Sequence, residues 1–596
     1  MLLHLLVFAP FVAAILMVLN SKEDFKSATH MAVLFAMVFF GMSIALVSLG
    51  NVATTPMEWL WIPGSKGPAY YYLYSHGIGS WMVFLSCGLS LVALISARGF
   101  LGNNYRNFAI GIFSLMGAMN GTFLAADAVL FFFFFEAMVI PAAILIASFG
   151  GEKRREAAMT FAIYTLVGSA PMMVALWYLL TVADNSLASS IAAAVQGLPE
   201  NTQLVVLVCF LIAFLVKTPI FPFHGWQAIT YSEAPAPLSA ILTGAMSKAG
   251  VFGFIAWVAP IFSFNMEEVS YMAWLGLATA IYGALMALRA TDGKKLLAFS
   301  SMSHLGIAVA GVFSFSEAMF SAVLMLLVAH GISAGVQYFL LGVAERMTGT
   351  RNIEEMGGLS HKNPAFSFLF GAAGVMALAV PGTAGFVGEF TVLLSLWDMS
   401  PVCAGFMGFT MILSAAYMLR FIQKVIFGKP AREYVEGKRA SHLEGFAYGM
   451  MLLLLLVLGL HPSFVTRSLH VYDESVMEQT MLEQDLTASV EEDGDEEPED
   501  VETLESHIAA SSDIAKLDSS LVKAGFSEEE RRELIRQVIE TEANIAKATV
   551  LAVEKQQRED ETEVRGIADK DYELLEPATG ESGAASEMNE KEVSND

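Results

Sequence analysis

Residues 206–257 read VLVCFLIAFLVKTPIFPFHGWQAITYSEAPAPLSAILTGAMSKAGVFGFIAW, which is two hydrophobic stretches joined by a proline-rich loop. Each hydrophobic stretch contains one lysine, Lys217 or Lys248. A charge at the centre of a bilayer costs about 3 kcal/mol or more, so an intramembrane lysine indicates a functional site. The loop prolines remove backbone donors that hydrocarbon cannot replace, so this backbone must lie within protein or face a water-filled cavity. The pattern is typical of ion sites built at broken membrane helices.

The composition of the whole chain agrees with a membrane protein. Of its 596 residues, 55% are hydrophobic and 16% are charged, and the mean hydropathy is +0.55. We therefore expect an all-α polytopic membrane protein with about 14 transmembrane helices. The apolar segments long enough to span are 2–19, 29–49, 78–97, 108–125, 127–149, 157–181, 204–222, 237–260, 271–288, 294–314, 316–344, 364–394, 402–423 and 442–460.

The basic residues predict the orientation of these helices. If the loops alternate sides, one side receives nearly all the bases, including Lys153–Arg155 and the cluster from Arg420 to Arg439. The opposite side receives only Lys66 and Arg467. Positively charged loops stay in the cytoplasm, so we expect a cytoplasmic (inner) membrane protein with both termini on the outer side.

Two apolar segments are interrupted in a similar way. The segment 204–222 is broken at Lys217-Thr218-Pro219, and the segment 364–394 is broken at Val380-Pro381-Gly382. Paired interruptions in corresponding parts of two halves are typical of transporters built from inverted repeats. The hydropathy pattern therefore predicts two inverted repeats, each with one broken helix.

The acidity of the chain lies in its last part. Residues 471–596 hold 37 acidic and 11 basic residues, whereas the first 470 residues hold 22 acidic and 23 basic ones. We expect 461–596 to be an acidic, partly disordered C-terminal extension, with the low-complexity segment 486–505 disordered. Residues 526–560 have the pattern of a helix that Ser527 could cap. They have too few apolar positions for a strong core stripe, so we favour a solvated or partly disordered tail.

Four charged residues lie in the middle of apolar segments, and we interpret them as a candidate functional site: Glu136, Lys217, Lys248 and Glu389. An unpaired carboxylate in hydrocarbon would become protonated, whereas a lysine partner would keep it charged. Lys217 is the candidate partner of Glu136. Its place in the last turn of a half-helix favours a cation, while burial disfavours any charge. A static buried ion pair is the alternative interpretation.

Three histidines are weaker candidates: His224, His304 and His330. Imidazole can pass a proton near neutral pH, but a hydrogen-bonded core histidine is equally common. The three cysteines, Cys87, Cys209 and Cys403, are far apart and fit neither a metal site nor an iron–sulfur cluster. We expect no metal, no cofactor and no redox centre in this chain.

Several motifs carry a family resemblance: FFEAMVIP (134–141), KTPIFPFHGW (217–226), EAPAPLSAILTGAMSKAG (233–250), DGKKLLAFSSMSHLG (292–306), AHGISAGVQYFLLG (329–342), RNIEEMGGL (351–359) and PGTAGFVGEF (381–390). They resemble the antiporter-like proton-translocating subunits of respiratory complex I, closest to its M-type subunit (chloroplast D-type). Mrp-type antiporters and the membrane arms of energy-converting hydrogenases are related families. The resemblance covers about residues 100–460 and implies three regions. These are N-terminal transmembrane helices (1–100), an antiporter-like proton-translocating core (101–460) and the acidic extension (461–596).

The resemblance also assigns roles to individual residues. It implies that Glu136 tunes the channel lysine Lys217, which lies on the broken helix, and that Lys248 is the central lysine of the connecting axis. Glu389 falls where the M-type subunit has glutamate and sister subunits have lysine.

His304 and His330 match histidines of the same family motifs. The chain departs from the family pattern HTWLPDAHxEAP, which reads HGWQAITYSEAP here. The loop aspartate and the second histidine are replaced by Ile229 and Tyr231.

By this resemblance, the chain is a proton-translocating membrane subunit of an NADH (or other donor):quinone oxidoreductase, driven by redox chemistry in partner subunits. Those partners, further membrane-arm subunits among them, are expected to hold FMN or another donor site, iron–sulfur clusters and quinone. We expect the lipid bilayer and no nucleic acid as other contacts, and an unidentified partner for the acidic tail. The alternatives are an Mrp-like cation/proton antiporter subunit, a membrane subunit of an energy-converting hydrogenase or carbon-uptake complex, and a purely structural subunit.

Overall fold

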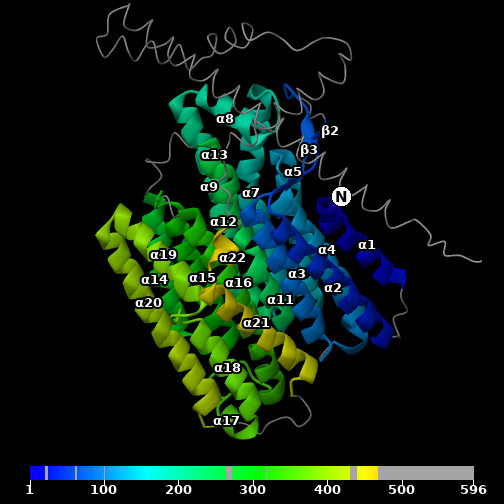
Figure 1. The fold of residues 1–596 in the computed structure, drawn as a ribbon, viewed down its shortest axis with the longest axis vertical. Coiled ribbons are helices and arrows are strands. Elements are labelled where there is room, and N and C mark those ends of the chain that lie inside the picture. Colours follow the sequence, from blue (N-terminus) through cyan, green and yellow to red (C-terminus); the bar gives the residue numbers. More distant parts are fainter. Residues whose placement is uncertain are drawn as a thin grey trace, which may run out of the picture. The chain divides into compact units, whose positions relative to one another are not determined.

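The computed structural model describes residues 1–19, 25–60, 64–99, 101–262, 271–316, 319–429 and 439–467. The acidic segment 486–505 and the predicted helix 526–560 lie outside the described residues. Within them the chain is largely helical, and most of the long helices lie roughly along one common axis (Figure 1).

The first half of the chain, up to residue 261, contains helices α1 to α13. Its helices are α1 (Leu2–Leu19), α2 (Phe25–Leu49), α3 (Gly77–Ala97), α4 (Tyr105–Leu124), α5 (Ala128–Ala137), α6 (Val139–Phe149), α7 (Arg154–Val182), α8 (Ala188–Gln196), α9 (Glu200–Lys217), α10 (Gln227–Glu233), α11 (Ala236–Ile241), α12 (Lys248–Gly253) and α13 (Ala259–Ile261). A short 3-10 helix, Gly102–Asn104, precedes α4. Two π-helical turns, η2 (Leu242–Met246) and η3 (Phe254–Val258), interrupt the span from α11 to α13.

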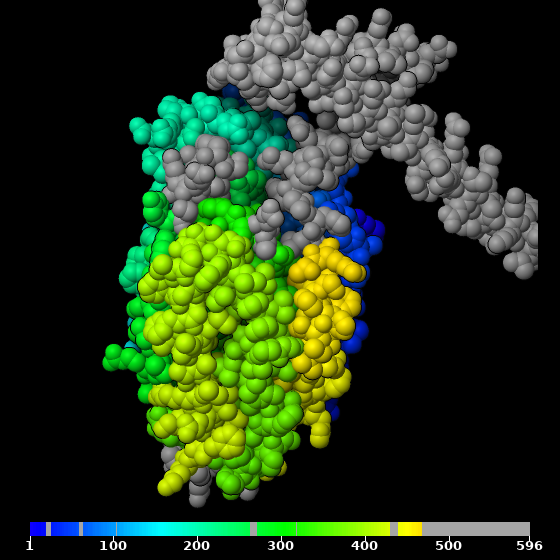
Figure 2. Space-filling model, turned by 60° about the vertical axis from the view of Figure 1, so that its left-hand side comes forward, coloured from blue at the N-terminus to red at the C-terminus, as the bar shows by residue number. Residues whose placement is uncertain are grey.

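The second half of the chain, from residue 271, contains helices α14 to α22. Its elements are α14 (Tyr271–Arg289), α15 (Gly293–Val312), α16 (Met319–Thr348), α17 (Leu359–Lys362), α18 (Pro364–Met376), α19 (Ala384–Met399), α20 (Pro401–Ile422), the π-helical turn η5 (Gln423–Phe427), α21 (His442–Leu460) and α22 (Ser463–Thr466). Figure 2 shows one face of the molecule, with α20 in yellow-green and α21 in yellow next to the blue N-terminal part of the chain.

Thirteen helices of the described residues are long and apolar enough to cross a membrane. They coincide with thirteen of the predicted segments. The remaining predicted segment, 364–394, is divided into α18 and α19, each shorter than 18 residues. The prediction of an all-α polytopic membrane protein is thus confirmed.

The sequence did not predict two short pairs of antiparallel strands between α2 and α3. Strand β1 (Val52–Ala53) pairs with β4 (Tyr74–Ser75), and β2 (Met57–Leu60) pairs with β3 (Ala69–Tyr71). Strands β2 and β3 lie with α8 at one end of the bundle, and α17 lies at the opposite end (Figure 1). We call the α17 end the basic end, because ion pairs of Arg351 and Lys424 lie there.

The centre of the bundle consists of helices that are buried over most of their length. Every residue from Ala236 to Val258 is buried, and α16 and α15 are buried over most of their residues. Close helix approach depends on small residues, as is usual in membranes. A Cβ atom added at Gly276 of α14 would lie 2.7 Å from the Gly306 carbonyl oxygen of α15, so the two backbones touch there.

Both predicted helix breaks are present. Helix α9 ends at Lys217 and the chain becomes helical again at Gln227, and α18 ends at Met376 before α19 begins at Ala384. The two inverted repeats remain a prediction from hydropathy.

A glycine of another helix packs against each break. A Cβ atom on Gly250 would lie 2.0 Å from the Thr218 hydroxyl, and one on Gly459 would lie 2.3 Å from the Thr383 carbonyl carbon. Thr218 and Thr383 are buried at these contacts, whereas Phe221 and Val380 beside them are exposed. Each break is therefore partly covered by a neighbouring helix, which its missing backbone hydrogen bonds require.

Candidate functional site

Lys217 ends α9 in a fully enclosed position. Its side chain is only 1% exposed, and its Nζ atom donates a hydrogen bond to the Phe135 carbonyl oxygen at 3.3 Å. The same ammonium group lies 4.5 Å from the centroid of the Phe135 ring. A cation over an aromatic face is stabilised by the ring quadrupole, which partly replaces lost hydration. The C-terminal end of α9 favours the positive charge as well.

Glu136 follows Phe135 on α5, and its carboxylate oxygens are buried. Among the described residues, neither oxygen has a hydrogen-bond partner. The carboxylate and the Lys217 ammonium attract each other electrostatically without forming a direct ion pair. The Ser169 hydroxyl of α7 lies next to the carboxylate but donates to the Thr165 carbonyl at 3.0 Å. A buried carboxylate with unfilled acceptor capacity is well suited to take up a proton.

The loop after Lys217 is held by side chains of other elements. Trp226 donates through Nε1 to the Val216 carbonyl oxygen at 3.0 Å, which satisfies a carbonyl in the last turn of α9. The Phe221 amide donates to the Thr279 hydroxyl at 3.2 Å. His224 lies in this loop, half-buried, with its Nε2 atom 3.2 Å from the Tyr282 hydroxyl. The structure brings His224 to this aromatic neighbour and not to the buried lysines.

Two of the residues that depart from the family motif, Gln227 and Tyr231, make hydrogen bonds that connect neighbouring elements. Gln227 donates through Nε2 to the Ala298 carbonyl oxygen at 3.0 Å, and Tyr231 is fully buried with its hydroxyl 3.3 Å from the Leu242 carbonyl oxygen. Tyr231 therefore tethers α10 to the π-helical turn that precedes Lys248.

Lys248 begins α12 directly after this π-helical turn and is completely buried. Its Nζ atom donates to the Thr243 carbonyl oxygen at 3.0 Å, and the Ser247 hydroxyl donates to the same oxygen. The Thr243 hydroxyl has no hydrogen-bond partner among the described residues. Single π-helical turns often occur at functional sites, because they redirect carbonyl groups. Here the turn supplies the oxygen that holds the lysine.

His304 of α15 and Glu389 of α19 form a buried contact. The Nε2 atom of His304 lies 3.1 Å from Glu389 Oε1, while its Nδ1 atom lies 2.8 Å from the Ser300 carbonyl oxygen. A carbonyl oxygen only accepts, so Nδ1 carries a proton. The proton between Nε2 and the carboxylate is then shared by the two side chains, as imidazolium and carboxylate or as imidazole and carboxylic acid.

His330 of α16 stacks on His304, with ring centroids 4.8 Å apart and an angle of 9° between the planes. Its Nε2 atom lies 3.1 Å from the Ser301 hydroxyl. Lys248 interacts electrostatically with both imidazoles. The stacked rings and the nearby hydroxyl offer several positions for a proton beside Glu389.

Three further hydroxyl groups in this cluster were not predicted from the sequence: those of Tyr417, Ser300 and Ser301. The Tyr417 hydroxyl of α20 lies 2.8 Å from the Ser300 hydroxyl and accepts from the Ser414 hydroxyl at 3.0 Å. Ser300 and Ser301 could have been found, since they precede His304 by one helical turn. Nothing in the sequence around Tyr417 connects it with α15.

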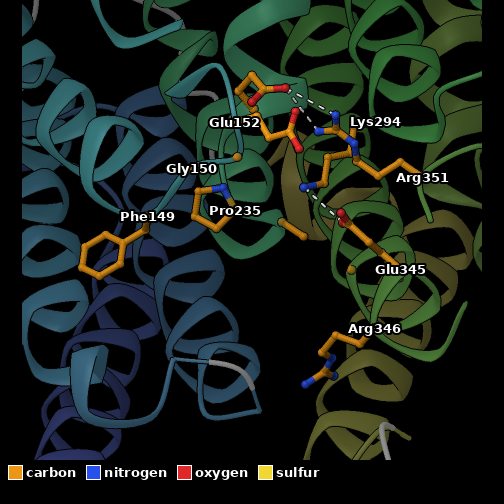
Figure 3. Close-up of a pocket in the computed structure, with 12 residues that line it drawn as sticks. Phe149, Gly150, Glu152, Pro235, Lys294, Glu345, Arg346 and Arg351 are labelled. Atoms are coloured by element: carbon orange, nitrogen blue, oxygen red, sulfur yellow. Dashed lines mark hydrogen bonds and ion pairs between the residues drawn. The ribbon is translucent and has the colours of Figure 1, made fainter. Parts of the chain in front are cut away.

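A pocket of about 470 Å³ opens at the basic end (Figure 3). Lys294 and Glu345 form an ion pair across it at 3.2 Å, and Arg351 lies 3.3 Å from Glu233. Pro235 and Ala236, where α11 begins, line the same pocket. The pocket thus reaches the start of the span that contains Lys248. Its charged residues were not among the predicted site residues, although their motifs were recognised.

Two features of the described residues concern metals. They contain no group of three or more His, Cys, Asp or Glu side chains that could hold a metal ion. Cys87 and Cys403 are buried and Cys209 is half-buried, and all three are unpaired thiols.

Comparison with known proteins gives the family of this chain. Residues 125–414 match the family described as NADH:quinone oxidoreductase/Mrp antiporter, TM. NADH-quinone oxidoreductase subunit M of Rhodobacter capsulatus is 30% identical over 488 residues, which are 78% of this chain and 94% of that protein. The chain belongs to this family.

Solved structures with the family fold are also similar. A chain of respiratory complex I from Thermus thermophilus with bound NADH is 30% identical, with a TM-score of 0.71, and the match covers 79% of this chain and 97% of that one. A chain of the Mrp complex from Dietzia sp. DQ12-45-1b has the same TM-score at 19% identity, covering 80% of this chain and 98% of that one. The matched family region, 125–414, contains Glu136, Lys217, Lys248 and Glu389.

Proposed function

We propose that this chain is a proton-translocating membrane subunit of a complex I-like NADH (or other donor):quinone oxidoreductase. The observation behind this proposal is a series of ionisable groups with buried polar atoms, from Glu136 and Lys217, through Lys248, to the His304–Glu389 contact. Charges are expensive in a membrane interior and are kept there for function. The relationship to NADH-quinone oxidoreductase subunit M supports the same assignment.

The first step of the proposed cycle takes place at Glu136 and Lys217. While the carboxylate is charged and near, its attraction keeps Lys217 protonated. When a change in a neighbouring subunit moves or neutralises Glu136, the buried ammonium loses this support and releases its proton toward Lys248. The contact of Gly250 with Thr218 joins the two helices at this point, so movement at one break reaches the other helix directly.

The second step moves the proton from Lys248 to Glu389. Lys248 releases its proton to the stacked imidazoles of His330 and His304, which lie within its electrostatic influence. His304 already shares a proton with Glu389, so the arrival of another proton favours release from the carboxyl group to the outer side. In this scheme His304 and His330 relay protons, whereas His224 has no part.

The partner subunits supply the redox chemistry. We infer that they hold the donor site, FMN or another, together with iron–sulfur clusters and quinone, and that this chain holds none of them. The chain would lie in the cytoplasmic membrane with the basic end inward and both termini outward. Residues 1–100 would form the N-terminal helices, 101–460 the translocating core, and 461–596 an extension that docks a partner at the outer face.

Affinity purification of the chain from mild detergent tests this function. We expect its partners, identified by mass spectrometry, to include iron–sulfur and quinone-binding subunits. Recovery with small membrane subunits alone, together with sodium-dependent transport in the absence of an electron donor, would instead indicate an Mrp-like cation/proton antiporter. Recovery with hydrogenase or carbon-uptake subunits would assign the chain to a complex with a different electron donor, and the proposed proton path would be unaffected.

A further inference from the structure

An apolar groove of about 660 Å³ lies between α2 and α21, with α3 as its floor. Phe40 and Ile44 of α2 form one wall, Phe446 and Met450 of α21 form the other, and Leu89 of α3 lies at the bottom. Figure 2 shows α21 in yellow beside the blue N-terminal part of the chain. The side chains of Ile44, Phe446 and Met450 are exposed, so the described residues leave this groove uncovered.

A second pocket, of about 380 Å³, continues the groove at the basic end. It is lined by Arg98, Arg346 and Arg439, and it shares Ile95 and Leu443 with the groove. The groove therefore ends in a cluster of three guanidinium groups. This junction lies at the C-terminal end of α3 and the N-terminal end of α21.

The charges of this second pocket are not balanced. Glu444 also lines it and pairs with Arg346 at 2.6 Å, which leaves two arginines for one bound partner of opposite charge. Arg98 and Arg439 are exposed and form no ion pair with any described residue. An anion with an apolar body would satisfy both the arginines and the groove.

We propose that this site binds one anionic diacyl phospholipid of the basic-side leaflet. Its phosphate would lie between Arg98 and Arg439, since guanidinium groups bind phosphate oxygens through paired hydrogen bonds. Basic pockets between membrane helices are a recognised form of lipid headgroup site. The choice of a lipid over a partner's helix rests on the two arginines at the groove's end.

The length of the groove fits an acyl chain. Its lining on α2 runs from Val33 to Ser48, which is about 22 Å of helix at 1.5 Å per residue. One leaflet of a bilayer is roughly 15 Å deep in hydrocarbon, so an acyl chain lies within the groove over its full length.

Lipid binding to the purified full-length chain tests the proposal. In native mass spectrometry with added phosphatidylglycerol, we expect one tightly retained lipid, and with phosphatidylcholine none. The double variant Arg98→Gln/Arg439→Gln should bind phosphatidylglycerol about 30-fold more weakly, from about 1 kcal/mol per basic residue at the surface. Ile44→Trp, which fills the groove, should reduce retention without changing the preference for the anionic headgroup.

Arg155→Gln is the matched control, because it removes an exposed base at the same end outside the pocket. Its phosphatidylglycerol binding should equal that of the unchanged chain. Equal retention of the two lipids, or equal losses in the control and the double variant, would overturn the proposal. So would a cross-link from Met450 to a helix of another subunit in the assembled complex with no lipid retained there.

Discussion

The Nε2 atom of His304 lies 3.1 Å from Oε1 of Glu389, and both side chains are buried. Because the Ser300 carbonyl fixes a proton on the other ring nitrogen, this contact contains a single proton that the two side chains share. The pair joins α15 to α19 directly beyond the second helix break. We interpret Glu389 as the last buried proton acceptor of the path.

Replacing Glu389 by glutamine should stop proton transfer at this point. The amide keeps the shape and a hydrogen bond to His304 but cannot take up and release a proton. We expect redox-driven proton pumping to fall about a hundredfold, a typical loss for one acid–base group, with assembly of the complex unchanged. Asp398→Asn removes an exposed acid from the same helix and should pump normally. Normal pumping by Glu389→Gln would exclude this role.

Gly250→Ala should disturb the contact between the two lysine helices. The new methyl group would lie 2.0 Å from the Thr218 hydroxyl and 2.6 Å from the Phe214 carbonyl oxygen, so the helices must separate. Overpacking of this kind costs about 1–3 kcal/mol, which thermal unfolding in detergent would detect. Gly449→Ala has no atom within 4 Å of the new Cβ and should be neutral or slightly stabilising. Equal melting temperatures of the two variants would contradict the close contact of Gly250 with Thr218.

Arg351→Ala should loosen the basic end. Its guanidinium pairs with Glu233 at 3.3 Å and Asp292 at 3.4 Å, and donates to the Ser232 carbonyl at 2.6 Å. Truncation leaves the buried Glu233 carboxylate without this partner, at a cost of about 2 kcal/mol. Thermal unfolding of the purified chain measures this. A melting temperature equal to that of the exposed-base variant Arg155→Gln would show that the ion pairs add nothing.

Glu354 gives a pH-dependent prediction at the surface. The hydrogen bond from Lys424, together with Arg420, holds the pKa of Glu354 below its usual value of 4.5. The folded state thus favours the ionised form, so this contribution is present above pH 4.5 and is lost as the pH falls through the lowered pKa. Glu354→Gln should lower stability by at most about 1 kcal/mol at pH 7, the usual limit for exposed ion pairs.

Thermal unfolding at pH 7 and at pH 3.5 checks the pH dependence of Glu354. The difference between the unchanged chain and the variant should shrink at the lower pH. A difference that grows on acidification would contradict the sign of this effect.

Much of the architecture follows from local signals in the sequence. Apolar length predicts the spans, and a proline beside a charged residue, as at Lys217-Thr218-Pro219, predicts a break because both features oppose a continuous membrane helix. The two strand pairs between α2 and α3 were not predicted, since runs of two to four residues with no clear alternation carry little signal.

Contacts between residues far apart in the chain could not be predicted from the sequence. His304 and Glu389 are 85 positions apart, and only the packing of α15 on α19 brings them together. Tyr417 and the Phe135 carbonyl bind site residues through contacts that have no spacing rule. The sequence predicted Glu136 beside Lys217, whereas the structure has the ammonium on the preceding carbonyl and the two charges attracting each other without contact. The roles of the four charged residues stay predictions.

Redox-driven proton pumping by the assembled complex with Lys217→Ala tests the central claim most directly. The complex would be reconstituted in vesicles, with electron transfer and proton uptake recorded together, and Lys66→Ala, which removes an exposed base, would serve as the control. We predict that Lys217→Ala abolishes proton movement by this subunit while the complex still assembles, and that Lys66→Ala pumps normally. Undiminished pumping by an assembled Lys217→Ala complex would contradict the assignment of Lys217 to the proton path.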